Sequence, residues 1–227
     1  MIAALFDFDG TLYTGHVWQD LAGHLWQEKQ NRRWVVAYVV RNMMPLPLYK
    51  LGWVDQVTYY RLWGETMSWL LRGWQEEEGR ALFTRLTEER IMPNLRQDLV
   101  SRLRSHQDQG HWVALVSGTF APWLKIIAHH LGVEHAIGTP LELQQGRFSG
   151  RIIPPLCQGG GKPARVRAYL SERGLQVDWL GSYAYADSGT DIGLLSEIGH
   201  PIAVYPDEVL WEQAQAMKWP VIGEREP

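Results

Sequence analysis

The stretch Ile2-Ala3-Ala4-Leu5-Phe6-Asp7-Phe8-Asp9-Gly10-Thr11 decides the fold of this chain. Ile2 to Phe6 is a continuous apolar run, which predicts a strand buried in a parallel sheet that is covered on both faces. A period of two then sends the side chains of Asp7 and Asp9 to the same side. They follow the carboxyl end of the strand, where open α/β sheets bind their ligands. Gly10 permits a tight turn and a close approach of the backbone to a ligand.

The paired carboxylates of Asp7 and Asp9 predict a metal site. Two ionised carboxylates so close together repel each other unless one is protonated or a cation lies between them. Mg²⁺ suits this position, because it is commonly held by one or two carboxylates together with substrate phosphate. An Asp-x-Asp sequence also occurs as a solvated turn, so the prediction depends on later parts of the chain.

Length and composition limit the classes of protein. The chain has 227 residues and a net charge of −3, which suits one domain with a large insertion and predicts no nucleic-acid-binding surface. Its single cysteine, Cys157, excludes an internal disulfide and fits a reducing compartment. The first strand begins at once and Asp7 interrupts it too early for a signal peptide. We therefore expect a cytoplasmic protein, either a monomer or a homodimer.

Residues 14–91 show only helical patterns. Apolar residues recur at helical spacing over residues 16–30, 34–44, 57–71 and 75–90, and Pro45 and Pro47 are expected to stop the second of these helices. We therefore predict an all-helical cap over residues 14–91. The cap would be inserted into a core of residues 1–13 and 92–227.

The cap region is rich in tryptophan. Twelve tryptophans occur in the chain, and most of them lie between Trp18 and Trp74. Large rings can fill the core of a small helical module, line an aromatic pocket, or contact a membrane surface or a partner. Arg41, Lys50 and two prolines argue against a membrane span over residues 34–53, but a weak contact with a membrane surface stays open.

The second half of the chain alternates strands with helices. We expect strands over residues 112–116, 134–137, 201–205 and within 179–186, and a hairpin formed by residues 141–143 and 147–152. Helices are expected over residues 93–109, 122–131, 162–173, 192–198 and 207–218. This alternation predicts an α/β fold with a doubly wound, Rossmann-like parallel sheet.

Three further stretches follow strands or open helices in this half. Ser117-Gly118-Thr119 offers a hydroxyl and backbone N–H groups beside a helix start, which suits an anion. Lys162 follows three glycines and provides a point charge for phosphate. Asp187 and Asp191 add two carboxylates beyond another strand. Each stretch alone also has a structural explanation, as a helix cap, a solvated lysine or a turn.

Taken in order, these stretches resemble the haloacid dehalogenase superfamily. The order is Asp7-x-Asp9, then Ser117 after a strand, then Lys162, then Asp187 and Asp191 four residues apart. It is similar to the phosphoserine-phosphatase-like branch, subfamily IB, whose helical cap lies between the first and second motifs. The resemblance covers essentially the whole chain and implies a Mg²⁺-dependent phosphatase of a small phosphorylated metabolite.

The resemblance also implies roles for individual residues. Asp7 would be the nucleophile that forms an aspartyl-phosphate, and Asp9 the general acid and later the base. Asp7, Asp187 and the backbone carbonyl of Asp9 would bind Mg²⁺. Asp191 would orient the loop and Lys162, and Ser188 would be a second supporting residue of the site. The residues expected to contact phosphate or substrate are Gly10, His16, Ser117, Gly118, Thr119 and Lys162.

The sequence differs from phosphoserine phosphatases in the region that selects the substrate. Those enzymes carry a cap glutamate soon after the first motif, whereas this chain has no acidic residue there before Asp20. Its second motif reads Ser-Gly-Thr-Phe in place of Ser-Gly-Gly-Phe. With His16 and Trp18 nearby, we expect a larger or more apolar phosphomonoester. Phosphoserine itself, or a cap that serves as a membrane- or partner-binding module, are the alternatives.

Overall fold

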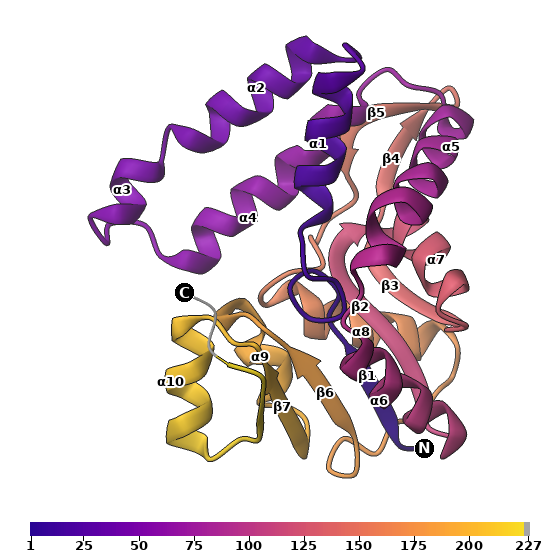
Figure 1. The fold of residues 1–227 in the computed structure, drawn as a ribbon, viewed down its shortest axis with the longest axis vertical. Helices are drawn as coiled ribbons and strands as arrows, with labels where there is room; N and C mark the ends of the chain where they lie inside the picture. The colour runs from indigo at the N-terminus through magenta and orange to yellow at the C-terminus, as the bar shows by residue number, and fades with distance from the viewer. Residues whose placement is uncertain (225–227) are drawn as a thin grey trace.

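Six parallel strands form the central sheet of the protein. The computed structural model describes residues 1–224. The strands lie in the order β3-β2-β1-β6-β7-β8, and all neighbours are parallel. This arrangement confirms the predicted α/β fold with a parallel sheet (Figure 1). The bounds are β1 (Ala3–Phe6), β2 (Trp112–Phe120), β3 (His135–Thr139), β6 (Tyr183–Ala186), β7 (His200–Val204) and β8 (Val221–Ile222).

Helices cover both faces of this sheet. Along β1, Ala4 and Phe6 join one hydrophobic cluster, whereas Ala3 and Leu5 join the other. This alternation follows from the period of two in a strand, and it makes β1 buried on both faces. The first face packs against α6 (Gln97–Asp108) and α7 (Ala121–His130), and the second against α8 (Gly161–Glu172), α9 (Ile192–Leu195) and α10 (Glu208–Met217).

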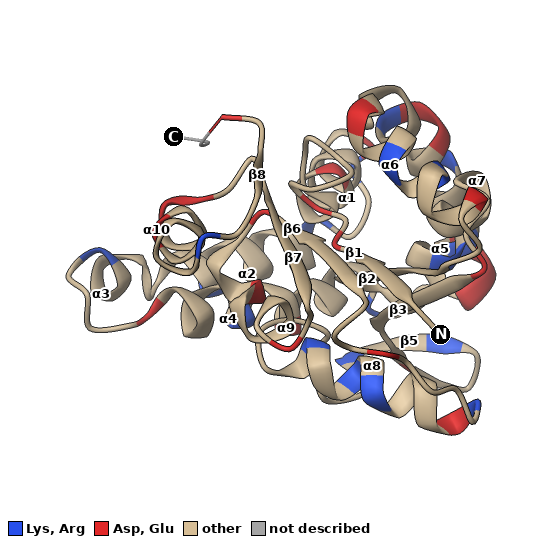
Figure 2. Cartoon of the chain, turned by 90° about the horizontal axis from the view of Figure 1, so that it is seen from below, with Lys and Arg blue, Asp and Glu red and all other residues tan. Residues whose placement is uncertain are grey.

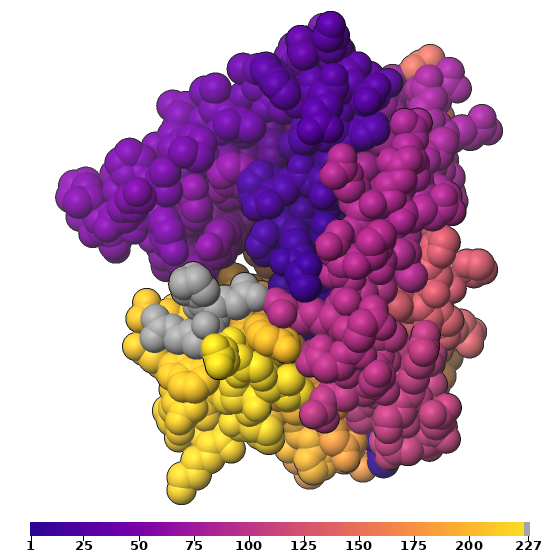
Figure 3. All heavy atoms as spheres, viewed as in Figure 1, coloured from indigo at the N-terminus to yellow at the C-terminus, as the bar shows by residue number. Residues whose placement is uncertain are grey.

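The chain over residues 14–91 forms only helices and the loops between them, as predicted. Its elements are α1 (Val17–Gln27), α2 (Arg32–Met43), α3 (Leu46–Lys50), α4 (Gln56–Thr66), the 3₁₀ helix η1 (Met67–Leu71), α5 (Glu76–Leu86) and the π-helical turn η2 (Thr87–Ile91). Helices α2, α3 and α4 project away from the sheet (Figures 1 and 3). Over the part of the chain that the structure describes, no helix combines the length and apolar character needed to cross a membrane.

The end of the helical region packs closely against the core. Phe83 of α5 stacks on Trp123 of α7 with the ring centroids 4.9 Å apart, and the Trp123 indole donates to the hydroxyl of Thr87. The predicted hairpin forms a separate two-stranded sheet of β4 (Leu141–Gln144) and β5 (Arg147–Ile152). It also contacts this region, through a bond from the Gly73 amide to the carbonyl of Phe148. The division into a core and a cap over residues 14–91 remains our proposal.

The structure corrects the bounds of the predicted strands and adds one strand. The first strand begins at Ala3, one residue later than predicted, and ends at Phe6, and Ile2 is exposed at the amino end of this central strand. The second strand continues through the Ser-Gly-Thr sequence to Phe120, with a register shift after Val116. Strand β8 was not predicted, because two residues are too few to show the alternation of a strand.

Pro45 follows the end of α2 at Met43, as predicted, but Pro47 and Pro93 lie in short helices that were not predicted. Pro47 lies in the first turn of α3, where a missing N–H leaves no hydrogen bond unmade, so the chain continues as a second helix. Pro93 lies in a short 3₁₀ helix, η3 (Met92–Asn94), and α6 begins only at Gln97. Pro93 therefore lies near the start of a helix, as predicted, but the α-helix itself begins four residues later.

Candidate active site

A cavity of about 610 Å³ lies between the carboxyl end of the sheet and helices α1, α2 and α4. It collects almost all the residues that the sequence analysis singled out. The predicted site residues that line it are Asp7, Asp9, His16, Ser117, Gly118, Thr119, Lys162, Asp187, Ser188 and Asp191. Residues 155 or more positions apart in the chain thus meet in one place, because parallel strands all end at this edge.

Lys162 forms the centre of the charged floor of the cavity. Its Nζ atom lies 2.7 Å from Oδ1 of Asp7 and 2.7 Å from Oδ1 of Asp191. Burial alone would lower the pKa of Lys162, but the carboxylates of Asp191 and Asp7 outweigh it and raise the pKa above its usual value. The first turn of α8 therefore holds a permanent positive charge beside Asp7.

Three carboxyl groups gather around this lysine. Oxygen atoms of Asp7, Asp187 and Asp191 all lie within 4.8 Å of one another. Burial, followed by repulsion from Asp7, raises the pKa of Asp187 well above its usual value. Burial also raises the pKa of Asp191 to about 6. The single positive charge of Lys162 does not balance three carboxylates. Carboxylate oxygens are ligands that Mg²⁺ prefers, so this cluster is suited to bind the ion.

The side chain of Asp9 points to a different part of the cavity. Its Oδ1 accepts a 2.7 Å bond from the amide of Val17, and its Oδ2 accepts bonds from the hydroxyls of Thr119 and Ser117. Burial raises the pKa of Asp9, against an opposing effect of the His16 charge. Asp9 therefore favours the protonated form more than a solvated aspartate does. Its expected contribution to a metal, through the backbone carbonyl, stays a prediction.

Gly10 lies behind the carboxyl cluster and is not one of the residues that line the cavity. Its φ of +76° suits glycine, and a Cβ atom built on it would lie 2.0 Å from Oδ2 of Asp187. The Asp187 carboxyl is also held by the hydroxyl of Thr11 through a 2.9 Å bond. The close approach that the sequence predicted at Gly10 is therefore made to Asp187.

The wall facing the sheet is aromatic, and the sequence predicted it only in part. The indole rings of Trp18 and Trp63 lie 4.8 Å apart between centroids, and the Tyr38 ring lies 5.3 Å from that of Trp63. The residues from helices α1, α2 and α4 and from η1 that form this wall are Val17, Trp18, Gln19, Tyr38, Gln56, Tyr60, Trp63, Gly64 and Met67. Lys162 is the one Lys or Arg among the described residues of the cavity.

Asp207 is a part of the site that sequence reasoning placed in a structural turn. Its side chain caps α10 and accepts hydrogen bonds from the Gly189 amide and the Ser188 hydroxyl. It also accepts a 3.0 Å bond from Nε2 of Gln56 on α4, which ties the helical wall to the core. In the sequence, Asp207 lies between a predicted strand and a predicted helix. This position indicates a helix cap and gives no sign of a role in the site.

A comparison with protein families agrees with this geometry. The sequence pattern of the haloacid dehalogenase-like hydrolases matches residues 4–196, from the first strand through the Asp187–Asp191 loop. The chain belongs to the haloacid dehalogenase-like hydrolase family. All four motifs of the site lie within the matched range.

Several relatives of this hydrolase carry phosphatase names. A histidinol-phosphatase of Neisseria meningitidis is 31% identical over 155 residues, which cover 67% of this chain and 70% of that protein. A probable phosphatase of Mycobacterium tuberculosis is 28% identical over 155 residues. The alignment covers 53% of that relative, so the chain matches about half of its length.

Solved structures confirm the fold of the hydrolase. A Bordetella pertussis protein of unknown function has a TM-score of 0.81 and 31% identity, covering 98% of this chain and 99% of that one. A phosphoserine phosphatase without ligand has a TM-score of 0.66 and 19% identity, covering 99% of this chain and 94% of that one. The second likeness concerns the fold alone.

Proposed function

We propose that the chain is a Mg²⁺-dependent phosphatase that hydrolyses a small-metabolite phosphomonoester, with Asp7 as its nucleophile. The observation that carries this proposal is the position of Asp7 in the cavity, beside buried Lys162 and within 4.8 Å of the Asp187 carboxyl. A carboxylate nucleophile that is already ionised needs positive charge around it to approach a phosphate ester. The phosphatase names of several relatives support the same reaction.

In the proposed reaction, a carboxylate oxygen of Asp7 attacks the phosphorus and the bond to the leaving alcohol breaks. Asp9 gives its proton to the leaving oxygen, which its raised pKa favours. Asp9 then takes a proton from the water that attacks the phosphorus, which releases phosphate and restores Asp7. Lys162 and the hydroxyl of Ser117 hold the phosphoryl oxygens throughout.

Asp7, Asp187 and the backbone carbonyl of Asp9 would hold the Mg²⁺ ion. When bound, the ion would offset the repulsion between the Asp7 carboxylate and the phosphoryl oxygens. The excess of carboxyl groups over Lys162 supports this assignment, since it leaves Asp187 with a raised pKa in the absence of a cation. Asp191 is paired with Lys162 and would position that lysine.

The aromatic wall favours a leaving alcohol that carries a flat ring and no carboxylate. Trp18 and Trp63 line the cavity, and an indole ring is suited to stacking with a flat ligand. The one Lys or Arg of the described cavity, Lys162, is already paired with Asp7 and Asp191. A serine carboxylate would therefore find no Lys or Arg free to pair with it there, whereas histidinol has an imidazole ring and no carboxylate. We place histidinol phosphate, the substrate named for the Neisseria relative, above phosphoserine.

Phosphate release from a panel of metabolite phosphates tests the proposal. The panel includes histidinol phosphate and phosphoserine, each assayed with Mg²⁺ and with EDTA, for wild type and Asp7→Asn. Metal-dependent release that the variant lacks would support the reaction, and the ranking of esters would test the substrate class. Efficient hydrolysis of phosphoserine would contradict the substrate class but not the reaction. Release that persists in Asp7→Asn would contradict the nucleophile.

A further inference from the structure

The arm formed by residues 29–61 has an apolar face that nothing in the described chain covers. The arm contains α2, α3 and the start of α4, and it stands out from the body (Figure 3). On α2, Val35 and Tyr38 point inward and are buried, whereas Val36, Val40 and Met43 are exposed. The spacing of three and four residues places the exposed set on one face, opposite the buried set. A helix that is apolar on two faces needs a second apolar contact.

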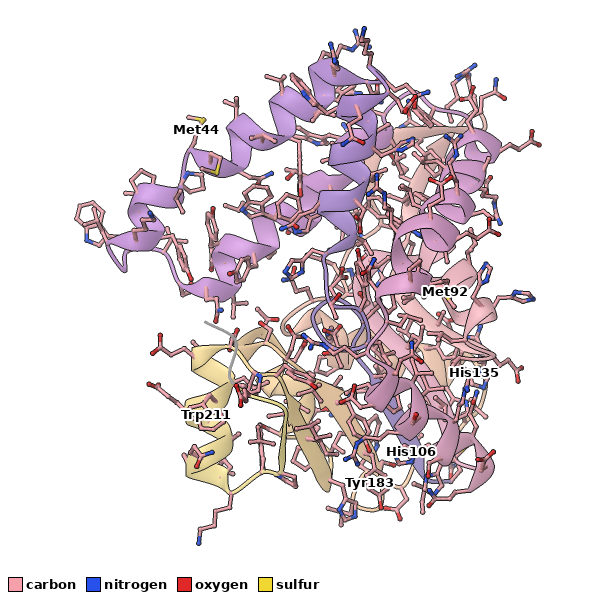
Figure 4. All side chains as sticks on the ribbon, viewed as in Figure 1. Met44, Met92, His106, His135, Tyr183 and Trp211 are labelled. Carbon is pink, nitrogen blue, oxygen red and sulfur yellow. The ribbon has the colours of Figure 1, made fainter. Side chains whose placement is uncertain are left out.

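The end of the arm is also apolar. Trp53 is 77% exposed and Leu51 is 64% exposed, both in the turn between α3 and α4. Met44, at the junction of α2 and α3, is 71% exposed, and Figure 4 shows it at the outer edge of the arm. These side chains do not line the cavity, so the active site gives no reason for their exposure.

The arm is basic although the chain as a whole is acidic. The net charge of the protein is −3, yet residues 29–61 contain one acidic residue, Asp55, and six exposed basic residues. Within the described chain, only Arg61 of these six is paired with a carboxylate, that of Glu65 just beyond the arm. The basic residues are Lys29, Arg32, Arg33, Arg41, Lys50 and Arg61. The helical spacing places Arg32 and Arg33 on the same face as Val36 and Val40, and α3 carries basic colour in Figure 2.

We propose that this arm docks on the surface of an anionic lipid membrane. Apolar side chains with interspersed Lys and Arg match the boundary between acyl chains and anionic headgroups. Tryptophan is favoured at that boundary, because its ring is apolar and its N–H group is polar. A second copy of the same arm fits less well, since the two basic faces would repel each other. The proposal concerns binding alone and does not depend on hydrolysis.

Co-sedimentation with vesicles tests the proposal. Wild type should sediment with vesicles of phosphatidylcholine and phosphatidylglycerol, and much less with phosphatidylcholine alone. Added salt should release it, because screening weakens the attraction to headgroups. The double variant Leu51→Ser with Trp53→Ser should lose about tenfold or more in vesicle affinity, through lost apolar contact. The variant Arg32→Gln with Arg33→Gln should weaken binding and its dependence on salt.

Leu180→Ser is the matched control, because Leu180 is 81% exposed but lies outside the arm. It should bind vesicles as wild type does, and so should Asp7→Asn, which separates docking from catalysis. All variants of the arm should hydrolyse a soluble ester normally, since their positions do not line the cavity. Wild type that ignores anionic vesicles would overturn the proposal. A different result would also overturn it: wild type that self-associates in gel filtration but does not bind vesicles, together with loss of this self-association in Leu51→Ser with Trp53→Ser. The arm would then join two copies of the chain.

Discussion

Lys162 and Asp7 form a buried ion pair in which Nζ and Oδ1 are 2.7 Å apart. The lysine enters from the start of α8, and the aspartate follows the central strand β1. Both side chains are almost fully buried. If one of them is removed, water does not solvate the charge that remains, so that charge is left uncompensated. The free energy of unfolding therefore depends on the charges of Lys162 and Asp7.

Removing this lysine should destabilise the protein and stop the reaction. We expect Lys162→Met to lower the free energy of unfolding by roughly 3–5 kcal/mol near pH 8, since it leaves buried carboxylates unpaired. Phosphate release should fall by about 10²-fold or more, as for loss of a group that stabilises transition-state charge. Denaturant unfolding and the activity assay measure the two effects.

The loss of stability in Lys162→Met should shrink as the pH falls. Burial raises the pKa of Asp191 to about 6 even beside the lysine, so without the lysine this group takes up a proton below neutral pH and its charge disappears. Lys125→Met, at an exposed position of α7, is the control and should behave as wild type. Equal unfolding free energies for wild type and Lys162→Met at pH 8 would contradict the argument.

Gly10→Ala tests the contact between the first motif and Asp187. The new Cβ atom would overlap the Asp187 carboxyl, at 2.0 Å, in a backbone conformation with φ of +76°. The positive φ alone costs about 1–2 kcal/mol, and displacing the carboxyl should reduce phosphate release by about 10²-fold. Gly110→Ala is the matched control, because its φ is +73° but its Cβ would meet nothing within 4 Å. It should lose similar stability and keep its activity, and equal activity losses would contradict the prediction.

Mg²⁺ should stabilise the folded protein through Asp187. At a concentration of 100 times the dissociation constant, binding to the folded state alone adds about 2.7 kcal/mol to the unfolding free energy. Thermal unfolding with MgCl₂ and with EDTA measures this shift. Asp187→Asn should abolish it, yet the metal-free variant should be at least as stable as metal-free wild type, because burial and Asp7 disfavour the charge of Asp187. Asp108→Asn, exposed at the end of α6, should retain the full shift. A full shift in Asp187→Asn would contradict the assignment.

The core of the site was predictable because its signals are local. The apolar run before Asp7 identified a central strand, and the order of Ser117, Lys162 and Asp187 matched the family's motifs. Parallel strands share one edge, so residues far apart in the chain could be expected to meet there. The direction of the Asp9 side chain was less predictable, because the strand ends at Phe6 and the period of two no longer applies beyond it.

The aromatic wall and the bond from Gln56 to Asp207 were not predictable in detail. Both depend on how α4 lies over the end of the sheet, and tertiary packing sets that angle. The periodicity of α2 shows the same limit, because Val36 and Tyr38 are both apolar and only the structure tells the exposed one from the buried one. Sequence patterns find an apolar face but do not say which surface covers it.

His106 lies far from the cavity, near Tyr183 at the opposite end of the sheet (Figure 4). Its Nε2 is 2.8 Å from the hydroxyl of Tyr185, and its Nδ1 is 2.8 Å from Nδ1 of His111. Burial lowers the pKa of His106 to about 4, and the nearby charges of His111 and Arg102 add to the effect. The folded state therefore keeps this ring neutral over a range of pH in which an unfolded histidine is protonated.

This difference predicts how the stability of the fold depends on pH. Between about pH 6.5 and pH 4 the unfolded chain binds a proton that folded His106 does not, so the unfolding free energy must fall as the pH falls. We expect a contribution of roughly 1–2 kcal/mol after allowance for solvent screening near the surface. His106→Gln should flatten the stability profile in this interval, whereas His130→Gln, exposed at the end of α7, should leave it unchanged. Urea unfolding at a series of pH values measures the slope, and a wild-type slope retained in His106→Gln would assign the dependence to other groups.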